Sequence, residues 1–155
     1  MDEKQKEVYE LIKEVLTGYE FAYEENDEKD IISISLVGND LSIPVLFGID
    51  TYLNSIKLIS NVPFSINKEK ITDLIIACNV INETIPCGKF FASLATNSLI
   101  YKNDLIFEDS IVSEKAIQTL VNLSLDIIDT YNEKLFGLNC GIIDLQGFLK
   151  LMIDE

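Results

Sequence analysis

The spacing of apolar residues changes several times along this chain, and the order of these changes restricts the fold more than any other feature. Apolar residues recur at steps of three and four over residues 3–17 and alternate with a period of two over residues 31–60. Helical spacing returns over residues 67–83, alternation over 90–107, and helical spacing again over 113–137. The predicted order is helix, three strands, helix, two strands and a long helix. This order indicates an α+β fold with helices packed on an antiparallel sheet.

Turn residues divide the first strand region into three predicted strands. The turn sequence at 38–40 separates two alternating runs, which predicts a hairpin. A third strand is expected over residues 52–60, ending before Asn61 and Pro63. Because proline has no backbone N–H, Pro44 predicts that its strand lies at a sheet edge, has that N–H position facing away from its partner, or carries a bulge.

Glycine and proline mark the expected ends of the other elements. Gly18 is suited to end the first helix. Pro86 and Gly88 follow the second helix, where the chain must leave helical geometry. A second hairpin is expected around Asn97.

The long final helix is expected to begin after Ser113 and to end before Gly137. The tail from Ile142 to Glu155 is rich in Ile, Leu, Phe and Met and predicts a short helix. This helix either covers the domain's own core or meets a second copy of the chain, and the sequence leaves both alternatives open. We therefore expect one domain, residues 1–141, with a C-terminal helical extension, residues 142–155.

The composition excludes most catalytic chemistry. The chain has no His, no Arg and no Trp, and its 26 Asp and Glu residues against 12 Lys give a net charge of −14. Without His there is no Ser–His or Cys–His nucleophile pair and no His-ligated metal. Without Arg there is no bidentate group to hold a phosphate. We expect no catalytic residues, no cofactor and no metal site.

The strong negative charge also restricts the partners. Nucleic acids and anionic membranes are both bound mainly through Lys and Arg, so neither is expected to bind. The acidic residues of segment 20–30 are interpreted either as a site for a cation or basic partner, or as a solvated turn, and the turn is preferred. The segment fails as a calcium loop because Ile31 stands where an EF-hand needs Gly.

Several residues resemble parts of known sites but are interpreted as structural. Gly88 and Lys89 lack the earlier Gly and the following Ser or Thr of a phosphate loop. Cys87 has no nearby cation or second Cys to activate it, and Cys78 falls on the apolar face of a predicted helix. Together with Cys140 these cysteines are expected to remain thiols in the cytoplasm. The N-terminus lacks the apolar core of a secretory signal, and no apolar run approaches the ~18 to 20 residues of a membrane span.

Pairs of acidic residues are the remaining catalytic candidates, since two carboxylates can hydrolyse glycosides without His. Glu108 with Asp109, and Asp126 with Asp129, come closest to such a pair. Both pairs are expected to lie on solvated faces.

A set of short motifs lies at the ends of the predicted elements. They are Asn79-Val80-Ile81-Asn82, the break from Pro86 to Gly88, Gly88-Lys89-Phe90, Tyr101-Lys102 and Tyr131. With the order of elements, these motifs resemble the YbjN family of small bacterial proteins over about residues 5–138. That family is described as sensory transduction regulators and shares its fold with the class I chaperones of type III secretion. The resemblance implies a compact α+β domain, a homodimer and no catalytic residues, while the missing Arg and the tail after Gly141 depart from the family pattern.

We therefore expect a cytoplasmic, non-enzymatic protein-binding module, chaperone-like or regulatory. In it, an exposed apolar surface kept soluble by negative charge would dock a segment of a partner protein. The alternative is a small acidic immunity or inhibitor protein whose charge steers it to a basic partner. A third interpretation, an enzyme that uses carboxylates, requires a concave pocket with two close acids.

Overall fold

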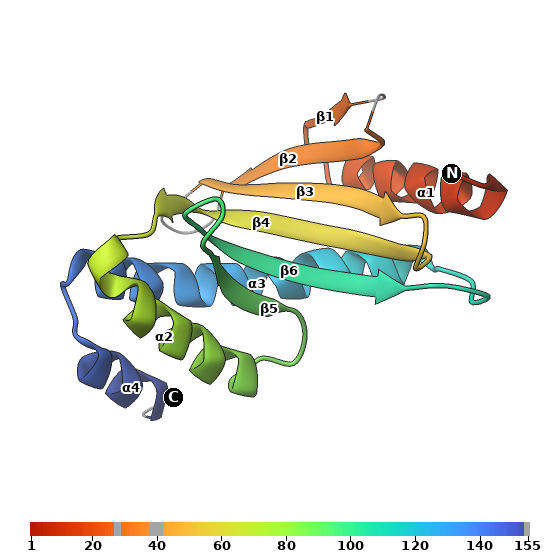
Figure 1. The fold of residues 1–155 in the computed structure, drawn as a ribbon. Coiled ribbons are helices and arrows are strands. Elements are labelled where there is room, and N and C mark those ends of the chain that lie inside the picture. The colour runs from red at the N-terminus through yellow and green to blue at the C-terminus, as the bar shows by residue number, and fades with distance from the viewer. Residues whose placement is uncertain (27–28, 38–41, 154–155) are drawn as a thin grey trace.

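The computed structural model describes residues 1–26, 29–37 and 42–153, which form a six-stranded antiparallel sheet and its helices (Figure 1). The strands are β1 (Tyr23–Asn26), β2 (Ile31–Val37), β3 (Ser42–Asp50), β4 (Ser55–Ser65), β5 (Lys89–Ser93) and β6 (Ser98–Ile106). The helices are α1 (Glu3–Gly18), the short 3-10 helix η1 (Lys68–Lys70), α2 (Ile71–Thr84), α3 (Glu114–Cys140) and α4 (Leu145–Ile153). The strand order β1-β2-β3-β4-β6-β5 and the helices that pack on the sheet confirm the predicted α+β fold.

The helices pack on one side of the sheet. Figure 1 shows α1 and α3 behind the strands, with α2 beside β5 and α4 next to α2. Strand side chains that face the helices are buried, with Ile32, Phe47 and Leu58 at most 1% exposed. They join Ile12 of α1 and Ile117 of α3 in one hydrophobic core. No helix of the described ranges covers the opposite face of the sheet. Nor is any of these helices both long and apolar enough to cross a membrane.

The sheet has one strand more than the sequence pattern predicts. Within the acidic stretch that we expected to be a turn, β1 pairs antiparallel with β2 at the edge of the sheet. Glu20 and Asp30, which bend the chain on either side, have positive φ angles of 59° and 51°. The strand includes exposed Glu24 and Glu25 and has no apolar alternation, so its pairing with β2 is what makes it a strand.

Pro44 lies where β3 has a partner on one side only. It pairs with Ser35 of β2, while the pairing of β3 with β4 runs from Leu46 to Asp50 and does not reach it. β3 lies between β2 and β4, so it is not the edge strand that was one of the three predicted arrangements. Pro44 instead occupies the end of β3 that has a partner on one side only. The hairpin turn predicted at 38–40 lies outside the described residues.

The prediction that the third strand ends before Asn61 was wrong. β4 begins at Ser55 and continues to Ser65, so it contains Pro63. The pairing of β4 with β6 shifts register between Asn61 and Ser65, and this irregularity accommodates the proline.

The prediction that the long helix ends before Gly137 was also wrong. α3 continues to Cys140, and Gly141, at φ +73°, supplies the left-handed residue that ends it. The extra turn carries Asn139, whose Oδ1 accepts a hydrogen bond from the Asn67 N–H at 2.8 Å and whose Nδ2 donates to the Ser65 carbonyl at 3.1 Å. The last turn of α3 is therefore fixed to the end of β4.

The tail contains helix α4, which packs against α2 and α3. Phe148 of α4 is fully buried and belongs to the same core as the sheet. Gly137 is buried where the tail crosses α3, and a Cβ there would lie 3.6 Å from the Ile143 side chain. The tail thus packs on its own chain, while a domain limit at residue 141 and any contact with a second copy stay predictions.

Candidate functional site

The motif residues predicted from the sequence meet at one place, where α2 ends and β5 begins. The Asn82 side chain accepts a hydrogen bond from the Phe90 N–H at 2.8 Å and donates one to the Phe90 carbonyl at 2.9 Å. The Phe90 ring lies 5.0 Å from the ring of Tyr101 and 6.3 Å from that of Tyr131. The motif therefore joins α2, β5, β6 and α3 through packing and hydrogen bonds.

Gly88 lies against the Tyr101 ring of the same cluster, at a position where a side chain has no room. Its φ is +69°, and a Cβ would lie 2.2 Å from the Tyr101 hydroxyl oxygen. That hydroxyl donates to the Cys87 carbonyl at 3.2 Å, and burial raises the pKa of Tyr101 to about 12. A neutral, buried tyrosine offers no acid or base near neutral pH, so we assign the cluster to structure.

The other candidates from the sequence are not brought together into a site. Cys87 is half-buried and its Sγ accepts a hydrogen bond from Asn103 at 3.4 Å, whereas burial raises the pKa of the Cys78 thiol to about 12. Lys89 is exposed at the start of β5. The described residues contain no group of three or more His, Cys, Asp or Glu placed to hold a metal ion.

The acid pairs lie apart, one in the loop after β6 and one on α3. Glu108, Asp109 and Asp126 are exposed, and Asp129 is half-buried. The solvated face expected for Glu108 and Asp109 agrees with this exposure, whereas Asp126 and Asp129 both line a concavity of about 560 Å³ between α3 and the start of the sheet.

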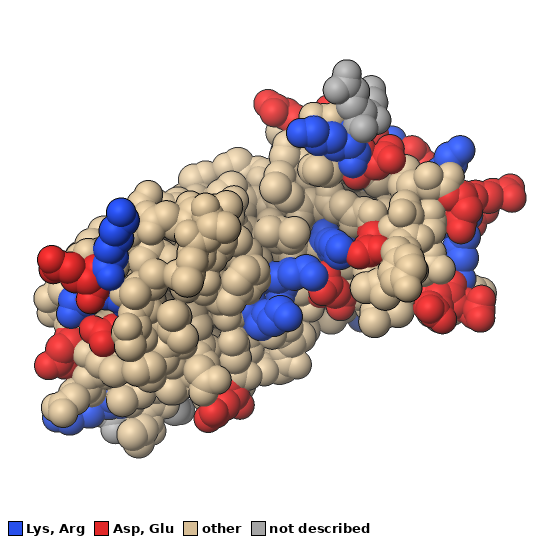
Figure 2. All heavy atoms as spheres, in the orientation of Figure 1, with Lys and Arg blue, Asp and Glu red and all other residues tan. Residues whose placement is uncertain are grey.

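The side of the sheet away from the helices carries an unusual set of apolar residues. We call this the open sheet face and define it by Ile31, Leu46, Ile59, Phe91 and Ile100. Leu46 pairs with Ile59 across β3 and β4, and Phe91 pairs with Ile100 across β5 and β6. Leu46 is 38% and Phe91 37% exposed. Figure 2, which views this side, shows an area without charged side chains over one end of the sheet, next to a group of lysines and acids at its middle.

A small hollow of about 240 Å³ opens in the open sheet face at Gly48. Ile31, Leu46 and Ile59 line it together with the charged residues Lys29, Asp30 and Lys57. The absent side chain of Gly48 leaves space above β3, since a Cβ there would have no neighbour closer than 3.9 Å. Such a hollow has the shape to hold an apolar side chain of a ligand.

Lysines also lie on this side of the sheet, where Lys102 is the cross-strand partner of Ile59 and of Lys89. Lys57 forms an ion pair with Asp50, and Lys102 pairs with Asp104 at 2.8 Å. The Lys57 ammonium, together with two N–H groups of the following turn, lowers the pKa of Asp50 to about 2. These pairs limit the net charge beside the apolar residues.

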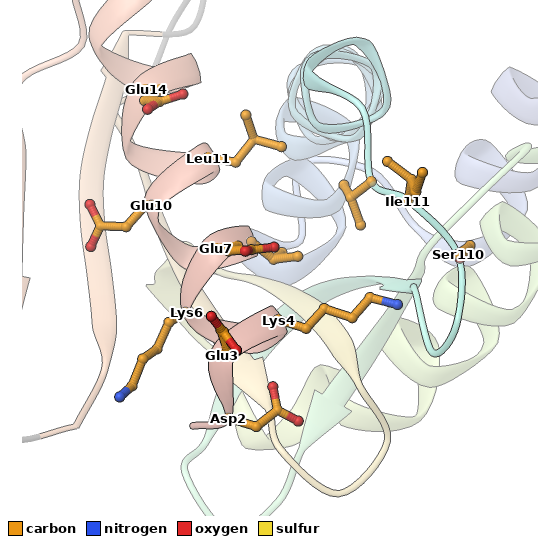
Figure 3. Close-up of a pocket in the computed structure, with 12 residues that line it drawn as sticks. Asp2, Glu3, Lys4, Lys6, Glu7, Glu10, Leu11, Glu14, Ser110 and Ile111 are labelled. Atoms are coloured by element: carbon orange, nitrogen blue, oxygen red, sulfur yellow. The ribbon is translucent and has the colours of Figure 1, made fainter.

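A second and larger concavity, of about 990 Å³, lies between α1 and residues 110–112 (Figure 3). We call it the α1 groove. Val8, Leu11 and Val112 contribute apolar surface, and its remaining lining is mostly charged. The lining acids are Asp2, Glu3, Glu7, Glu10 and Glu14, and the lining lysines are Lys4 and Lys6.

The sequence contained a signal for the open sheet face that the period-two pattern does not use. Adjacent apolar pairs occur at Ile31–Ile32, Leu58–Ile59, Phe90–Phe91 and Leu99–Ile100. Because neighbouring strand residues point to opposite faces, such pairs indicate a sheet that is apolar on both sides. The α1 groove had no equivalent signal, since its walls come from segments 100 residues apart.

Comparison with known proteins identifies the family that the chain matches and solved structures of similar fold. The model of the YbjN family, "Putative bacterial sensory transduction regulator", matches residues 9–136. Among curated protein sequences none matches the chain. The crystal structure of YbjN from E. coli is similar to this fold with a TM-score of 0.63 and 14% identity, covering 83% of this chain and 89% of that one.

Two solved complexes contain chains of similar fold. The ExsC–ExsE complex matches with a TM-score of 0.63 and 14% identity, covering 87% of this chain and 97% of that chain. The HopA1–SchA chaperone–effector complex matches with a TM-score of 0.62 and 10% identity, covering 86% and 98%. The predicted resemblance to YbjN and to type III secretion chaperones is thus confirmed at the level of family and fold.

Proposed function

Because the chain belongs to the YbjN family, we propose that it is a non-enzymatic protein-binding module, chaperone-like or regulatory, which docks a segment of a partner protein. We further propose that it does so in the cytoplasm, as a homodimer. The similarity of the fold to two protein complexes, one of them a chaperone–effector complex, supports a protein as the partner.

The open sheet face is the observation that supports this proposal most directly. An antiparallel sheet that is covered on one side ordinarily turns polar residues to water on the other. Here Leu46 packs beside Ile59, and Phe91 beside Ile100, on a side that no described helix covers. Burying one such side chain completely against a ligand stabilises a complex by up to ~1.5–3 kcal/mol.

In the proposed mode of binding, an apolar stretch of the partner lies across the strands. One of its side chains enters the hollow at Gly48, where there is room above β3. The net charge of −14 keeps the chain soluble despite the exposed apolar surface. No bond is made or broken, so binding is reversible and needs no cofactor.

Site-directed photo-crosslinking in the native cell tests the proposal. A photoreactive amino acid is placed at Leu46, at Phe91, and at the control position Leu123 of α3. Leu123 is a matched control because it is 38% exposed, as is Leu46, but lies on a helix. We expect the same protein to be linked at Leu46 and Phe91 and not at Leu123. Equal labelling at all three positions, or no linked protein, would contradict the proposal.

The homodimer is tested separately by light scattering of the purified chain. We expect the mass of two chains across a range of concentrations. A mass of 17.5 kDa at every concentration would show a monomer and remove the dimer from the proposal.

A further inference from the structure

We infer that the α1 groove docks a basic amphipathic segment of a partner protein. This goes beyond the proposed function, because it assigns a second surface and names the chemistry of what binds there. An apolar side chain of the segment enters between Leu11 and Ile111, and its Lys or Arg side chains face the glutamates of α1.

Both walls of the groove are hydrogen-bonded to the turn between β3 and β4, residues 51–54. On α1, the side chain of Gln5, 4% exposed, donates to the Thr51 carbonyl at 3.1 Å and to Asn54 Oδ1 at 2.7 Å. On the other wall, the Phe107 N–H donates to the Asn54 carbonyl at 2.8 Å, and Ser110 Oγ donates to the Phe107 carbonyl at 2.5 Å. Because Asn54 contacts both sides, the groove exists before a ligand arrives and little ordering is needed on binding.

The floor of the groove is apolar and incompletely covered. Val8 is 5% exposed, and Leu11 and Val112 are half-buried, whereas Ile111 at the rim is 96% exposed. Figure 3 shows Leu11 pointing from α1 toward the side of the groove where Ile111 lies. The apolar surface between these two side chains is what a ligand side chain would cover.

The rim is acidic along the length of α1. Glu3, Glu7, Glu10 and Glu14 follow one another at steps of three and four, which places them on one side of the helix. Glu10 pairs with Lys13 at 2.7 Å, but in the ranges that the structure describes Glu3, Glu7 and Glu14 have no cationic partner. Three exposed carboxylates beside an apolar floor favour a cationic ligand with apolar side chains.

The two lysines of the lining offset only part of this charge, because five acids stand against them. Lys4 reaches across the groove to the carbonyl oxygen of Glu108 on the opposite wall and keeps its positive charge. Figure 3 shows Lys6 pointing away from the Ser110 side of the groove. The segment from Glu3 to Glu14 spans about 16 Å at ~1.5 Å per residue, which matches about three turns of a bound helix.

Fluorescence anisotropy with a synthetic peptide tests the inference. The probe is a labelled amphipathic helix of about three turns with Leu on one face and Lys on the other, added to the full-length chain. We expect saturable binding that weakens as salt is raised. We expect Glu7→Lys combined with Glu14→Lys to lower the affinity about tenfold or more, and Ile111→Ser to lower it about threefold or more.

Matched variants separate the groove from the overall charge. Glu69→Lys with Glu133→Lys changes the net charge equally at exposed positions elsewhere, and Ile142→Ser removes an isoleucine that is 73% exposed on the tail. Each is expected to change the affinity less than about twofold. An equal loss in groove and control variants would mean diffuse attraction and overturn the inference, as would equal binding of a peptide with the same residues in scrambled order.

Variants of the open sheet face distinguish this inference from the proposed function. Leu46→Ser with Phe91→Ser is expected to leave the peptide affinity unchanged. If these substitutions abolish binding while the groove variants do not, the peptide occupies the open sheet face, and the inference fails although the proposed function stands. If the probe binds to no variant and not to the native chain, the inference is likewise wrong, and the crosslinking result at Leu46 and Phe91 is unaffected.

Discussion

Asn82 holds Phe90 by both of its backbone groups, with its Oδ1 2.8 Å from the Phe90 nitrogen and its Nδ2 2.9 Å from the Phe90 carbonyl oxygen. One side chain at the end of α2 thus replaces the ladder partner that the free edge of β5 lacks. Phe90 in turn is 1% exposed, and its ring packs against that of Tyr101. The Asn82 amide therefore joins β5 to α2, in addition to the pairing of β5 with β6.

Replacing Asn82 by Ala removes both hydrogen bonds and leaves the Phe90 N–H and carbonyl without them. We expect a loss of about 1–3 kcal/mol in the free energy of unfolding, measured by urea denaturation. Asn79→Ala is the matched control in the same motif, because Asn79 is exposed and its side chain donates to Glu83, one turn away, at 3.2 Å. Equal effects of the two substitutions would contradict the role assigned to Asn82.

Gly88→Ala introduces a Cβ 2.2 Å from the Tyr101 hydroxyl oxygen at a φ of +69°. The clash and the backbone strain together should destabilise the fold by roughly 2–5 kcal/mol. Gly18→Ala adds the same methyl group in helix α1 with nothing within 4 Å and should stabilise by about 0.5–1 kcal/mol. Thermal unfolding of the two variants checks both signs, and a native-like melting temperature for Gly88→Ala would refute the packing described.

Phe148→Ala tests whether the tail is part of the core. Because Phe148 is fully buried, its truncation should cost about 3–5 kcal/mol. Leu151→Ala on the same helix should cost far less, since Leu151 is 43% exposed. If the two variants unfold at the same urea concentration, α4 does not contribute to the core as the structure shows, and residues 142–155 act as an appendage.

The three thiols should react in the order of their exposure. Cys140 is exposed, Cys87 is half-buried, and burial raises the pKa of Cys78 to about 12, so little thiolate forms there at pH 8. We expect a thiol-specific chromogenic reagent to react first with Cys140 and to reach Cys78 only after unfolding in denaturant. Cys140→Ser should remove the fast phase and Cys78→Ser should leave it, and the reverse result would show that the two sites are misassigned.

Acid should loosen the turn between β3 and β4. The pKa of Asp50 is lowered to about 2 by Lys57 and by turn N–H groups, against an ordinary carboxyl pKa of ~4. A lowered pKa in the folded state contributes stability that is present above about pH 4 and is lost as the pH falls toward about 2. Asp50→Asn should therefore flatten the dependence of the melting temperature on pH in this range, whereas Asp109→Asn, at an exposed loop position, should not. An unchanged pH profile for Asp50→Asn would exclude this role.

Much of the fold could be predicted because its elements follow local rules. Periodic apolar residues predicted α1, α2, α3 and the strand pairs, and the Ser113 side chain caps α3 as expected, accepting from the Ala116 N–H at 3.2 Å. β1 could not be predicted, because it becomes a strand through pairing with β2 and has no pattern of its own. The end of α3 was misjudged because Gly137 lies inside the helix, and the left-handed residue that ends it is the later Gly141.

The candidate surfaces were less predictable than the fold. The roles of Asn82, Gly88 and Phe90 were visible only as a motif, and their contacts show that the motif maintains the packing of β5. The open sheet face follows from apolar residues at adjacent positions such as Phe90 and Phe91. A search for apolar residues at every second position finds only one residue of each such pair. The α1 groove depends on how residues 110–112 approach α1. Because these segments are far apart in the sequence, no local pattern predicts the groove.

Strand β1 also determines how this sheet can associate with others. Its free edge carries exposed Glu24 and Glu25, so two molecules that approached each other along this edge would bring like charges together. Polymerisation by lateral strand exchange is therefore disfavoured at one border of the sheet. The opposite border, β5, is blocked in another way, because α2 packs against it and Asn82 of that helix occupies both backbone groups of Phe90.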